Sequence, residues 1–310
     1  MLDVAIMVEG QHGMHWEAWQ RLGRTVEELG FGGLFRSDHF LDHFAHDGDD
    51  APETLDLWPS LTWLADHTET IEFGPLVTPM SFRHPVHVAR AAADIDNLAD
   101  GRLVLGVGAG WQELEHETYG FDLLEPAARF DRFEEGVEVV ASLLRRNEPV
   151  TFDGAYFQLD DARLYPGPDR PGGTRLLVGG NGPRRTLPLA AAYADEWNAV
   201  FSTPAEVASL NERFDDEVAD AGRDPDDVRR SLMTPVLFGR DDAELDRVID
   251  AHPFAEDAEA FRESGAVVGT GAEVADHLER LADVGLDRVM LQWLDVGAID
   301  RLGAFADAVL

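Results

Sequence analysis

An aspartate and a histidine stand side by side in Ser37-Asp38-His39-Phe40, directly after the apolar segment Gly33–Arg36. That segment is typical of a short buried strand, and an α/β barrel places its reactive side chains at the C-terminal ends of strands. Because histidine titrates near neutral pH, His39 is a candidate to carry a proton, with Asp38 as a second catalytic candidate. The structural alternative is that Asp38 caps the next helix and His39 binds a backbone carbonyl.

Two glycine-rich turns have the composition of ligand-binding loops. In Gly106–Trp111 the small residues would let a ligand approach backbone amides closely. In the second, Gly179–Gly182 precedes Pro183-Arg184-Arg185, where we expect a helix to begin. Free N–H groups at a helix start, next to two arginines, favour an anion such as phosphate. The alternative is an ordinary tight turn with two surface arginines.

A third segment, Phe73–Pro79, ends an apolar run and contains Gly74 and Pro75. Glycine and proline within a buried strand indicate a bulge or an unusual peptide bond, and Thr78 offers a hydroxyl to a ligand. The alternative is that Pro79 simply ends the strand.

Histidines near the acidic loop raise the possibility of a metal site. The candidates are His12, His15, His39, His43 and His46, of which His39 and His43 are four residues apart. Barrel metal hydrolases usually carry His-x-His in the first strand, which Leu2–Val8 lacks. The aspartates of the same loop, Asp42, Asp47, Asp49 and Asp50, are typical of a solvated connection. We therefore expect no catalytic metal, and a metal hydrolase remains an alternative.

The elements that must position these residues alternate regularly along the chain. Strands are predicted at Leu2–Val8, Gly33–Arg36, Ile71–Val77, Leu103–Val107, Arg175–Val178, Trp197–Val200, Leu232–Phe238 and Arg288–Trp293. Helices are predicted at Trp16–Leu29, Trp58–His67, Pro85–Leu98, Pro126–Arg145, Pro183–Tyr193, Pro204–Ala221, Ala272–Val284 and Ile299–Val309. This alternation over 310 residues predicts the α/β class, as one (β/α)8 TIM barrel domain over residues 1–310. A doubly wound sheet is the alternative, but Glu9–Gly13 is not the G-x-G-x-x-G turn that usually follows its first strand.

Two insertions exceed the barrel pattern, at about 147–172 and about 239–266. The first predicts a hairpin, with Val150–Phe152 and Tyr156–Leu159 on either side of Asp153-Gly154. The second is acidic and is predicted to be helical. Insertions at the mouth of a barrel often cover the active site.

Composition restricts the function classes. The chain has 60 acidic and 25 basic residues, a formal net charge of −35, and no lysine or cysteine. Such a surface repels nucleic acid and anionic membranes, and the lack of cysteine excludes disulfides and thiolate chemistry. The carboxylates are spread along the predicted helices, which favours a protein from a salt-rich cytoplasm; an ordinary acidic protein from a high-GC genome is the alternative. With no signal peptide visible and no apolar run of about 20 residues, we expect a cytoplasmic protein.

Taken together, these motifs resemble the bacterial luciferase-like monooxygenase superfamily over nearly the whole chain. The segments that carry the resemblance are Ser37–Phe40, Val77–Pro79, Gly106–Trp111, Glu113–Gly120, Arg129–Glu135, Gly179–Thr186, Ala194–Asn198 and Gly269–Val274. The chain is most similar to the branch of oxidoreductases that depend on the deazaflavin coenzyme F420. The resemblance implies a luciferase-type (β/α)8 barrel, with the cofactor ring in the barrel mouth.

The resemblance also assigns roles to residues. It places Asp38 and His39 beside the deazaflavin ring, with His39 as a proton donor or substrate-binding group. It implies cofactor contacts by Leu76 and Thr78, ribityl contacts by Ala109 and Gly110, and phosphate contacts by Gly179, Gly180, Asn181 and Gly182. The helix start predicted after this turn adds Arg184 as a phosphate ligand. A non-prolyl cis peptide is implied behind the ring, and Pro75–Leu76 is the matching bond.

One departure from the family pattern concerns Trp111, because sugar-phosphate dehydrogenases of this family carry a catalytic glutamate there. They also hold the substrate phosphate with lysines, which this chain lacks. Both differences argue against a sugar-phosphate substrate, although arginines can substitute in binding. Other groups follow at Glu113, Glu115 and His116, but we expect a helix to carry them away from the mouth.

The sequence thus predicts an F420-dependent oxidoreductase that transfers a hydride between deazaflavin C5 and an unidentified organic substrate. The first alternative is an FMN-dependent luciferase-like monooxygenase with a partner reductase. The second is a non-catalytic flavin-binding protein. We expect a small-molecule substrate, no nucleic-acid or membrane partner and, by resemblance, a homodimer.

Overall fold

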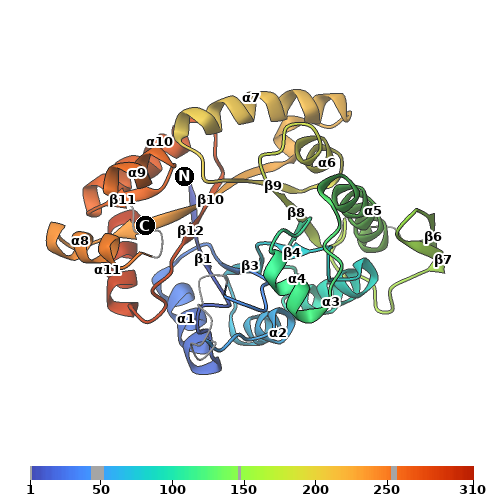
Figure 1. Cartoon of the computed structure of the whole chain (residues 1–310), viewed down its shortest axis with the longest axis horizontal. Helices are drawn as coiled ribbons and strands as arrows, with labels where there is room; N and C mark the ends of the chain where they lie inside the picture. The colour runs from blue at the N-terminus through green and yellow to red at the C-terminus, as the bar shows by residue number, and fades with distance from the viewer. Residues whose placement is uncertain (1, 43–51, 146–147, 253–256) are drawn as a thin grey trace.

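The computed structural model describes residues 2–42, 52–145, 148–252 and 257–310, and its centre is a barrel of parallel strands surrounded by helices (Figure 1). The strands run in the order β3-β2-β1-β12-β10-β9-β8-β5-β4. Their bounds are β1 Asp3–Val8, β2 Gly33–Arg36, β3 Glu72–Pro75, β4 Thr78–Pro79, β5 Val104–Gly108, β8 Arg175–Gly179, β9 Glu196–Val200, β10 Arg229–Phe238 and β12 Arg288–Gln292. The predicted (β/α)8 architecture is therefore confirmed.

The barrel closes where one predicted strand is divided. β3 pairs with β2, β4 pairs with β5, and Phe73 bridges to Leu103, so β3 and β4 share one of eight positions around the barrel. Gly74 permits this closure, because a Cβ there would lie 1.8 Å from the carbonyl oxygen of Val104. The sequence prediction of one continuous strand over 71–77 is wrong at its end, where the chain turns between β3 and β4.

That turn contains a non-prolyl cis peptide, as the resemblance implied, but the bond is Leu76–Val77. The expectation of Pro75–Leu76 is wrong by one residue. The motif locates the segment in which the chain must turn, whereas the packing of β3 and β4 selects the bond.

The helices follow the prediction closely. Their bounds are α1 Trp16–Leu29, α2 Leu57–His67, α3 Pro85–Leu98, α4 Glu113–Tyr119, α5 Pro126–Arg145, α6 Thr186–Tyr193, α7 Pro204–Asp220, α8 Asp242–Asp250, α9 Ala258–Glu263, α10 Gly271–Asp283 and α11 Ile299–Val309. Local signals explain the boundaries. Thr203 and Glu206 form a capping box at the start of α7, and Gly30 ends α1 with a positive φ of 89°.

Two layers of apolar side chains position the mouth. The larger layer fills the space between barrel and helices; α1, for example, buries Ala18, Trp19, Leu22 and Val26 at helical spacing. The smaller layer fills the barrel interior with Ala5, Met7, Phe35, Leu76, Val104, Leu177 and Met290. The barrel is therefore a packed core, and a ligand can enter only at one of its ends.

Both insertions have the predicted kind of structure. The first contains the antiparallel hairpin β6 (Val150–Asp153) and β7 (Gln158–Ala162), which lies outside the ring of helices in Figure 1. The second contains α8 and α9. The short strand β11 (Val267–Gly269), which pairs with β10, and helix α4 were not among the predicted elements. Helix α6 begins three residues later than predicted, at Thr186.

No helix in the described ranges is both long and apolar enough to cross a bilayer. Within the same ranges, no three histidine or carboxylate side chains gather as metal ligands. His43, His46, Asp47, Asp49 and Asp50 lie outside the described residues.

Candidate active site

A cavity of about 570 Å³ opens where the barrel strands end. Its apolar lining consists of Met7, Leu76, Val77, Pro79, Ala109, Trp111, Phe130, Val200, Phe201, Met233 and Leu294. Its polar lining includes Glu9, Gln11, His12, Ser37, His39, Glu115, Arg129, Asn198 and Gln292. Ligand sites are typically apolar cavities of this size with a few fixed polar groups.

His39 lines this cavity and is held by a carboxylate that the sequence did not assign. Its Nδ1 lies 2.9 Å from Oε1 of Glu115, and the backbone N–H of Phe40 donates to Oε2 of Glu115 at 3.0 Å. In the amide orientation that pairs donors with acceptors, Gln112 donates to the same carboxylate at 2.9 and 3.2 Å. Glu115 is only 1% exposed. Because a carboxylate accepts hydrogen bonds, we assign the proton to Nδ1, which leaves Nε2 for exchange.

The surroundings of His39 also set its charge. Burial disfavours the imidazolium, but the hydrogen bond and charge of Glu115, with smaller contributions from Glu9 and Asp38, outweigh burial and raise the pKa of His39. The imidazolium therefore persists to higher pH than that of a free histidine.

Glu115 reaches the mouth because α4 begins right after the β5 turn. The sequence analysis expected a helix to carry Glu113, Glu115 and His116 away from the mouth, and for Glu115 this is wrong. In a helix starting at Glu113, the residue two positions on points back toward the barrel, whereas Glu113 is exposed. The buried residues of α4 are Glu115 and His116, both polar, so no apolar periodicity marks the side of this helix that faces the barrel.

Trp111, at the position where the resemblance implied a glutamate, contributes to the cavity wall. Its ring meets His39 edge-on, with 5.6 Å between ring centroids and an interplanar angle of 81°. The side chain is 57% exposed, so it lies at the rim of the cavity. Trp111 therefore restricts access to His39 and supplies no acid.

Asp38 does not line the cavity. Its carboxylate is 3% exposed, accepts from the hydroxyl of Thr78 at 2.7 Å, and receives two hydrogen bonds from Arg83 at 2.8 and 3.1 Å. Thr78 is fully buried and donates to this carboxylate. Neither residue lines the cavity, and the polar atoms of both side chains face each other and Arg83. They fix the loop that presents His39.

A second carboxylate, Glu9, enters the cavity from β1. It accepts hydrogen bonds from the amides of Gln292 at 2.6 Å and Gln11 at 2.9 Å. The carbonyl of Gln11 in turn accepts from Ser37, whose oxygen accepts from the N–H of Gly10. These contacts fix a negative charge beside the histidine, with neutral donors as its hydrogen-bond partners.

The glycine-rich turn after β8 divides into two parts. Gly179 and Gly180 line the cavity, and Gly180 has a φ of 123°, a conformation that favours glycine. Asn181 instead ties the turn to β9, accepting from the N–H of Val200 at 2.9 Å and donating to its carbonyl at 2.8 Å. Gly182 is exposed and does not line the cavity.

The two arginines of this turn point elsewhere. Arg185 binds Glu134, Asp131 and the carbonyl of Ala127, all at the start of α5. Arg184 is exposed and lies outside the cavity lining. Arg184 was predicted as a phosphate ligand because helix α6 was expected to begin at Pro183; the helix starts later, at Thr186, so the residue faces solvent.

The remaining predicted contacts, Leu76, Ala109 and Gly110, do line the cavity. The structure adds Glu9, Glu115, Arg129 and Gln292, which the sequence analysis did not assign to the site. These residues come from segments distant in sequence; Glu115 and Arg129 stand in two segments that carry the family resemblance, but the resemblance assigned neither of them a role. The described part of the second insertion, α8 and α9, does not line this cavity.

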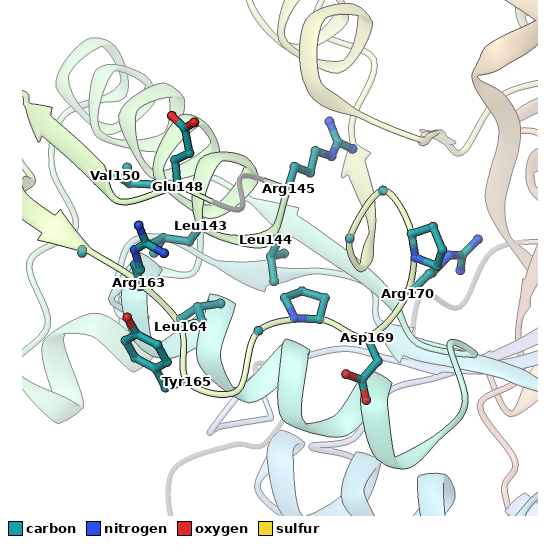
Figure 2. A pocket seen from close by; sticks show the side chains of 16 residues that line it. Leu143, Leu144, Arg145, Glu148, Val150, Arg163, Leu164, Tyr165, Asp169 and Arg170 are labelled. Carbon is teal, nitrogen blue, oxygen red and sulfur yellow. The ribbon is translucent and has the colours of Figure 1, made fainter.

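A separate cavity of about 500 Å³ lies between the C-terminal end of α5 and the loop after β7 (Figure 2). Helices run antiparallel to the strands of the barrel, so this end of α5 lies away from the mouth. The labelled side chains of Arg145, Glu148 and Arg163 do not converge on one point in Figure 2. We therefore place the active site in the mouth.

Comparison with known proteins identifies the family. Residues 3–255 match the family model described as luciferase-like monooxygenase. The chain is 33% identical over 241 residues to the F420-dependent glucose-6-phosphate dehydrogenase of Microbacterium testaceum (strain StLB037), covering 76% of this chain and 69% of that protein. It is 28% identical over 300 residues to the protein of the same name from Amycolatopsis mediterranei (strain U-32), covering 92% and 84%.

A solved structure described as an F420-dependent secondary alcohol dehydrogenase in complex with an F420-acetone adduct has the same fold. The TM-score is 0.81 at 22% identity, over 100% of this chain and 99% of that chain. At this identity the likeness concerns the fold alone.

Proposed function

The chain belongs to the luciferase-like monooxygenase family, and from this membership we propose that it is an F420-dependent oxidoreductase that transfers a hydride to or from an organic substrate. Relatives that share a quarter to a third of its residues over most of the chain are named as F420-dependent enzymes. The observation that carries the proposal is the apolar mouth cavity in which Glu115 holds His39.

The cavity has the chemistry that a deazaflavin needs. Leu76 and Val77 supply apolar surface for a ring, and Ala109, Gly110 and Gly180 leave backbone accessible to the ribityl chain and phosphate. When bound, the cofactor supplies the hydride donor or acceptor at C5. Within the glycine turn, Gly179 and Gly180 are the phosphate contacts that we retain, with Asn181 bracing them.

His39 moves the proton that accompanies hydride transfer. Its Nε2 donates to the developing alkoxide when a carbonyl is reduced, and accepts the proton when an alcohol is oxidised. Glu115 fixes the ring orientation and stabilises the imidazolium. Asp38 and Thr78 do not contact the substrate in this proposal. Asp38 accepts hydrogen bonds from Thr78 and Arg83, and these contacts hold in place the loop that carries His39.

The substrate that fits this site is an alcohol or carbonyl compound rather than a sugar phosphate. Next to His39 the cavity presents the carboxylate of Glu9, which repels a phosphate. The walls around it, including Trp111 and Met233, are apolar and exclude water from the transferred proton.

Binding titrations followed by tryptophan fluorescence test the cofactor assignment. We expect saturable binding of F420 with an affinity higher than that of FMN, and reduction of F420 by a member of a panel of secondary alcohols. Tighter binding of FMN than of F420 would overturn the assignment.

Replacement of His39 tests the proton role. We expect His39→Ala to keep F420 affinity within about twofold and to lose at least about tenfold in single-turnover rate, the low end for an acid–base residue. The matched control is His87→Ala, which removes an exposed histidine from α3 and should change neither quantity. A wild-type rate with a wild-type pH profile for His39→Ala would mean that His39 is structural.

We also propose a cellular location, a salt requirement and an oligomeric state for this enzyme. The net charge of −35 supports a cytoplasmic protein whose folded state needs molar salt, because salt screens repulsion among surface carboxylates. A melting temperature that does not rise with salt would contradict this. A homodimer is proposed from family resemblance and is testable by sedimentation equilibrium.

A further inference from the structure

One cation in the mouth cavity lacks a polar partner among the described residues. Arg129, on the first turn of α5, lines the cavity; its side chain makes no hydrogen bond or ion pair to the described residues, and its Nε is buried without a partner. We propose that Arg129 binds the phosphate of the cofactor, a role for which the sequence had suggested Arg184. The inference rests on the proposed function.

The contrast with nearby arginines shows why the lack of a partner is informative. Arg185 satisfies its guanidinium with Glu134, Asp131 and the carbonyl of Ala127. In a chain with 60 acidic and 25 basic residues, a partly buried arginine has many carboxylates available. An unsatisfied buried donor costs free energy, so a guanidinium without a partner in a cavity indicates an anionic ligand.

A second arginine strengthens the local positive charge. Arg132 lies one turn further along α5, and its Nε is also buried without a partner. Burial lowers the pKa of Arg132; Asp122 and Tyr156 oppose this shift, and the charge of Arg129 adds to it as the smallest of these contributions. The two like charges therefore repel each other, and an anion bound at Arg129 would relieve this repulsion.

The position of Arg129 matches that of the glycine turn. Arg185, which follows that turn, is bonded to the start of α5, so the turn after β8 and the first turns of α5 lie side by side, as in Figure 1. Gly179 and Gly180 line the same cavity as Arg129. A phosphate can therefore meet the backbone of the turn and the guanidinium together.

One carboxylate of the cavity, that of Glu9, lies on the side opposite the glycine turn, whereas Glu115 is bonded to His39. Glu9 follows β1, and β8 is four positions from β1 in a barrel of eight, which is diametrically opposite. An anion is repelled from Glu9 and attracted to Arg129, so the ligand's charge selects its orientation across the mouth.

The test compares three ligands by fluorescence titration. They are F420, its derivative without the glutamate tail, and the corresponding ribityl deazaflavin without phosphate. We expect Arg129→Met to weaken F420 and the tail-less derivative by roughly ten- to a hundredfold, as for loss of a charged hydrogen bond, with the phosphate-free compound changed less than about threefold. Arg129→Lys should restore part of the affinity.

The matched control is Arg184→Met, which removes an exposed arginine next to the same turn and should change none of the three affinities. Weakening of F420 alone by Arg129→Met would assign Arg129 to the tail carboxylates and overturn the proposal. Equal weakening of all three ligands would show that Arg129 only shapes the cavity, and wild-type affinities would also overturn it. Circular dichroism confirms folding of each variant.

Failure of the proposed function gives a different result. If the wild-type protein binds FMN but none of the deazaflavins, the F420 assignment fails, and the same comparison between FMN and riboflavin then tests Arg129. An unchanged ratio of FMN to riboflavin affinity in Arg129→Met would overturn the inference in that case as well.

Discussion

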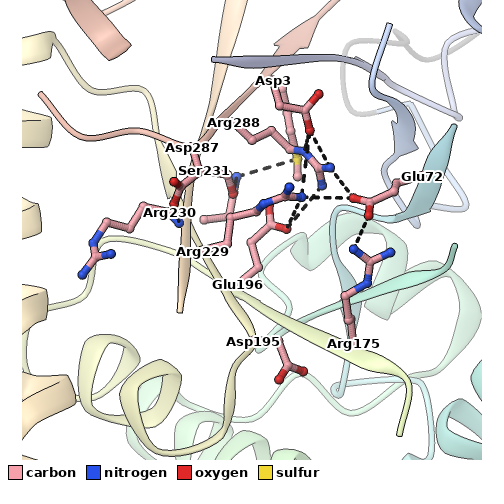
Figure 3. Close-up of polar contacts among 12 residues, drawn as sticks. Asp3, Glu72, Arg175, Asp195, Glu196, Arg229, Arg230, Ser231, Asp287 and Arg288 are labelled. Atoms are coloured by element: carbon pink, nitrogen blue, oxygen red, sulfur yellow. Dashed lines mark hydrogen bonds and ion pairs between the residues drawn. The ribbon is translucent and has the colours of Figure 1, made fainter. Parts of the chain in front are cut away.

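The two ends of the barrel treat charge in opposite ways. At the N-terminal ends of the strands, the first residues of six strands form one ion cluster, namely Asp3, Glu72, Arg175, Glu196, Arg229 and Arg288 (Figure 3). At the C-terminal ends, Arg129 has no ion-pair partner within the described ranges, and Glu9 has only amide donors as hydrogen-bond partners. In the cluster at the N-terminal ends, three carboxylates form ion pairs with three arginines. At the C-terminal ends, the charges of Arg129 and Glu9 are not paired with each other or with another ion of the described residues and can interact with a ligand.

Arg288 lies at the centre of this ion cluster at the N-terminal ends of the strands, which we call the closed end of the barrel. It is 1% exposed and donates to Asp3 at 2.7 Å, to Glu196 at 3.3 Å and to Glu72. Its guanidinium also lies over the ring of Phe35, which connects the cluster to the barrel core. A buried charge is tolerated when such partners surround it, so this end stabilises the fold, whereas the mouth keeps its charges for binding and proton transfer.

The largest effect that we expect comes from breaking the closed end. Arg288→Met leaves Asp3, Glu72 and Glu196 with fewer cations and should lower the free energy of unfolding by about 3–5 kcal/mol, as for loss of one partner of a buried ion pair. Denaturant titration measures this change. A loss below about 1 kcal/mol would mean that the cluster is not important for stability.

The closed end should also fail at acid pH. Burial raises the pKa of Glu72, but Arg288 and Arg175 outweigh it and hold the pKa at about 2. Stability from a depressed carboxyl pKa is present above the unfolded value and is lost as pH falls toward the folded one. The difference in unfolding free energy between wild type and Glu72→Gln should therefore be at most about 3 kcal/mol above pH ~4.5 and should narrow toward pH ~2. A difference independent of pH would contradict this assignment.

In the mouth, an equivalent change should alter chemistry more than stability. Glu115→Gln removes the charge that raises the pKa of His39, so in the reductive direction the fall in rate with rising pH should move to lower pH. We expect the single-turnover rate at neutral pH to fall about tenfold, equivalent to about 1.4 kcal/mol, with F420 affinity retained. An unchanged pH profile would show that the two side chains are not coupled.

The smallest effect should come from an ion pair that belongs to neither end. Arg280 and Asp276 form an exposed pair on α10 at 3.3 Å. Arg280→Met should change the free energy of unfolding by no more than about 0.5 kcal/mol, since exposed pairs contribute little. This variant is the control for Arg288→Met, and a comparable loss in both would mean that burial does not distinguish the cluster.

Most of the fold could be predicted from the sequence because its signals are local. Helices α1, α3, α5 and α11 have the predicted bounds, since each begins or ends at a cap, a proline or a change in apolar periodicity. The short strand β11 was missed because three residues carry too little pattern. The division between β3 and β4 was missed because it depends on contacts with β2 and β5.

The candidate site was predictable only in part. His39, Leu76, Ala109, Gly110, Gly179 and Gly180 stand in short motifs at strand ends, and all of them line the cavity. Asp38 and Thr78 stand in the same motifs, but their side chains bind each other and do not line the cavity. Their chain neighbours His39, Val77 and Pro79 line it instead, since successive side chains of an extended segment point in opposite directions. The sequence did not reveal which of the alternating side chains in these segments would face the mouth.

The sequence by itself determined the barrel, the family and the strand ends where chemistry takes place, because periodicity, caps and glycine turns act over a few residues. Only the tertiary structure decided which charges meet. Glu115 lies 76 residues from its partner His39, and Asp3 lies 285 residues from Arg288. Such pairs depend on barrel closure, which brings distant strand ends within 3 Å. Closure likewise left Arg129, rather than Arg184, facing the cavity.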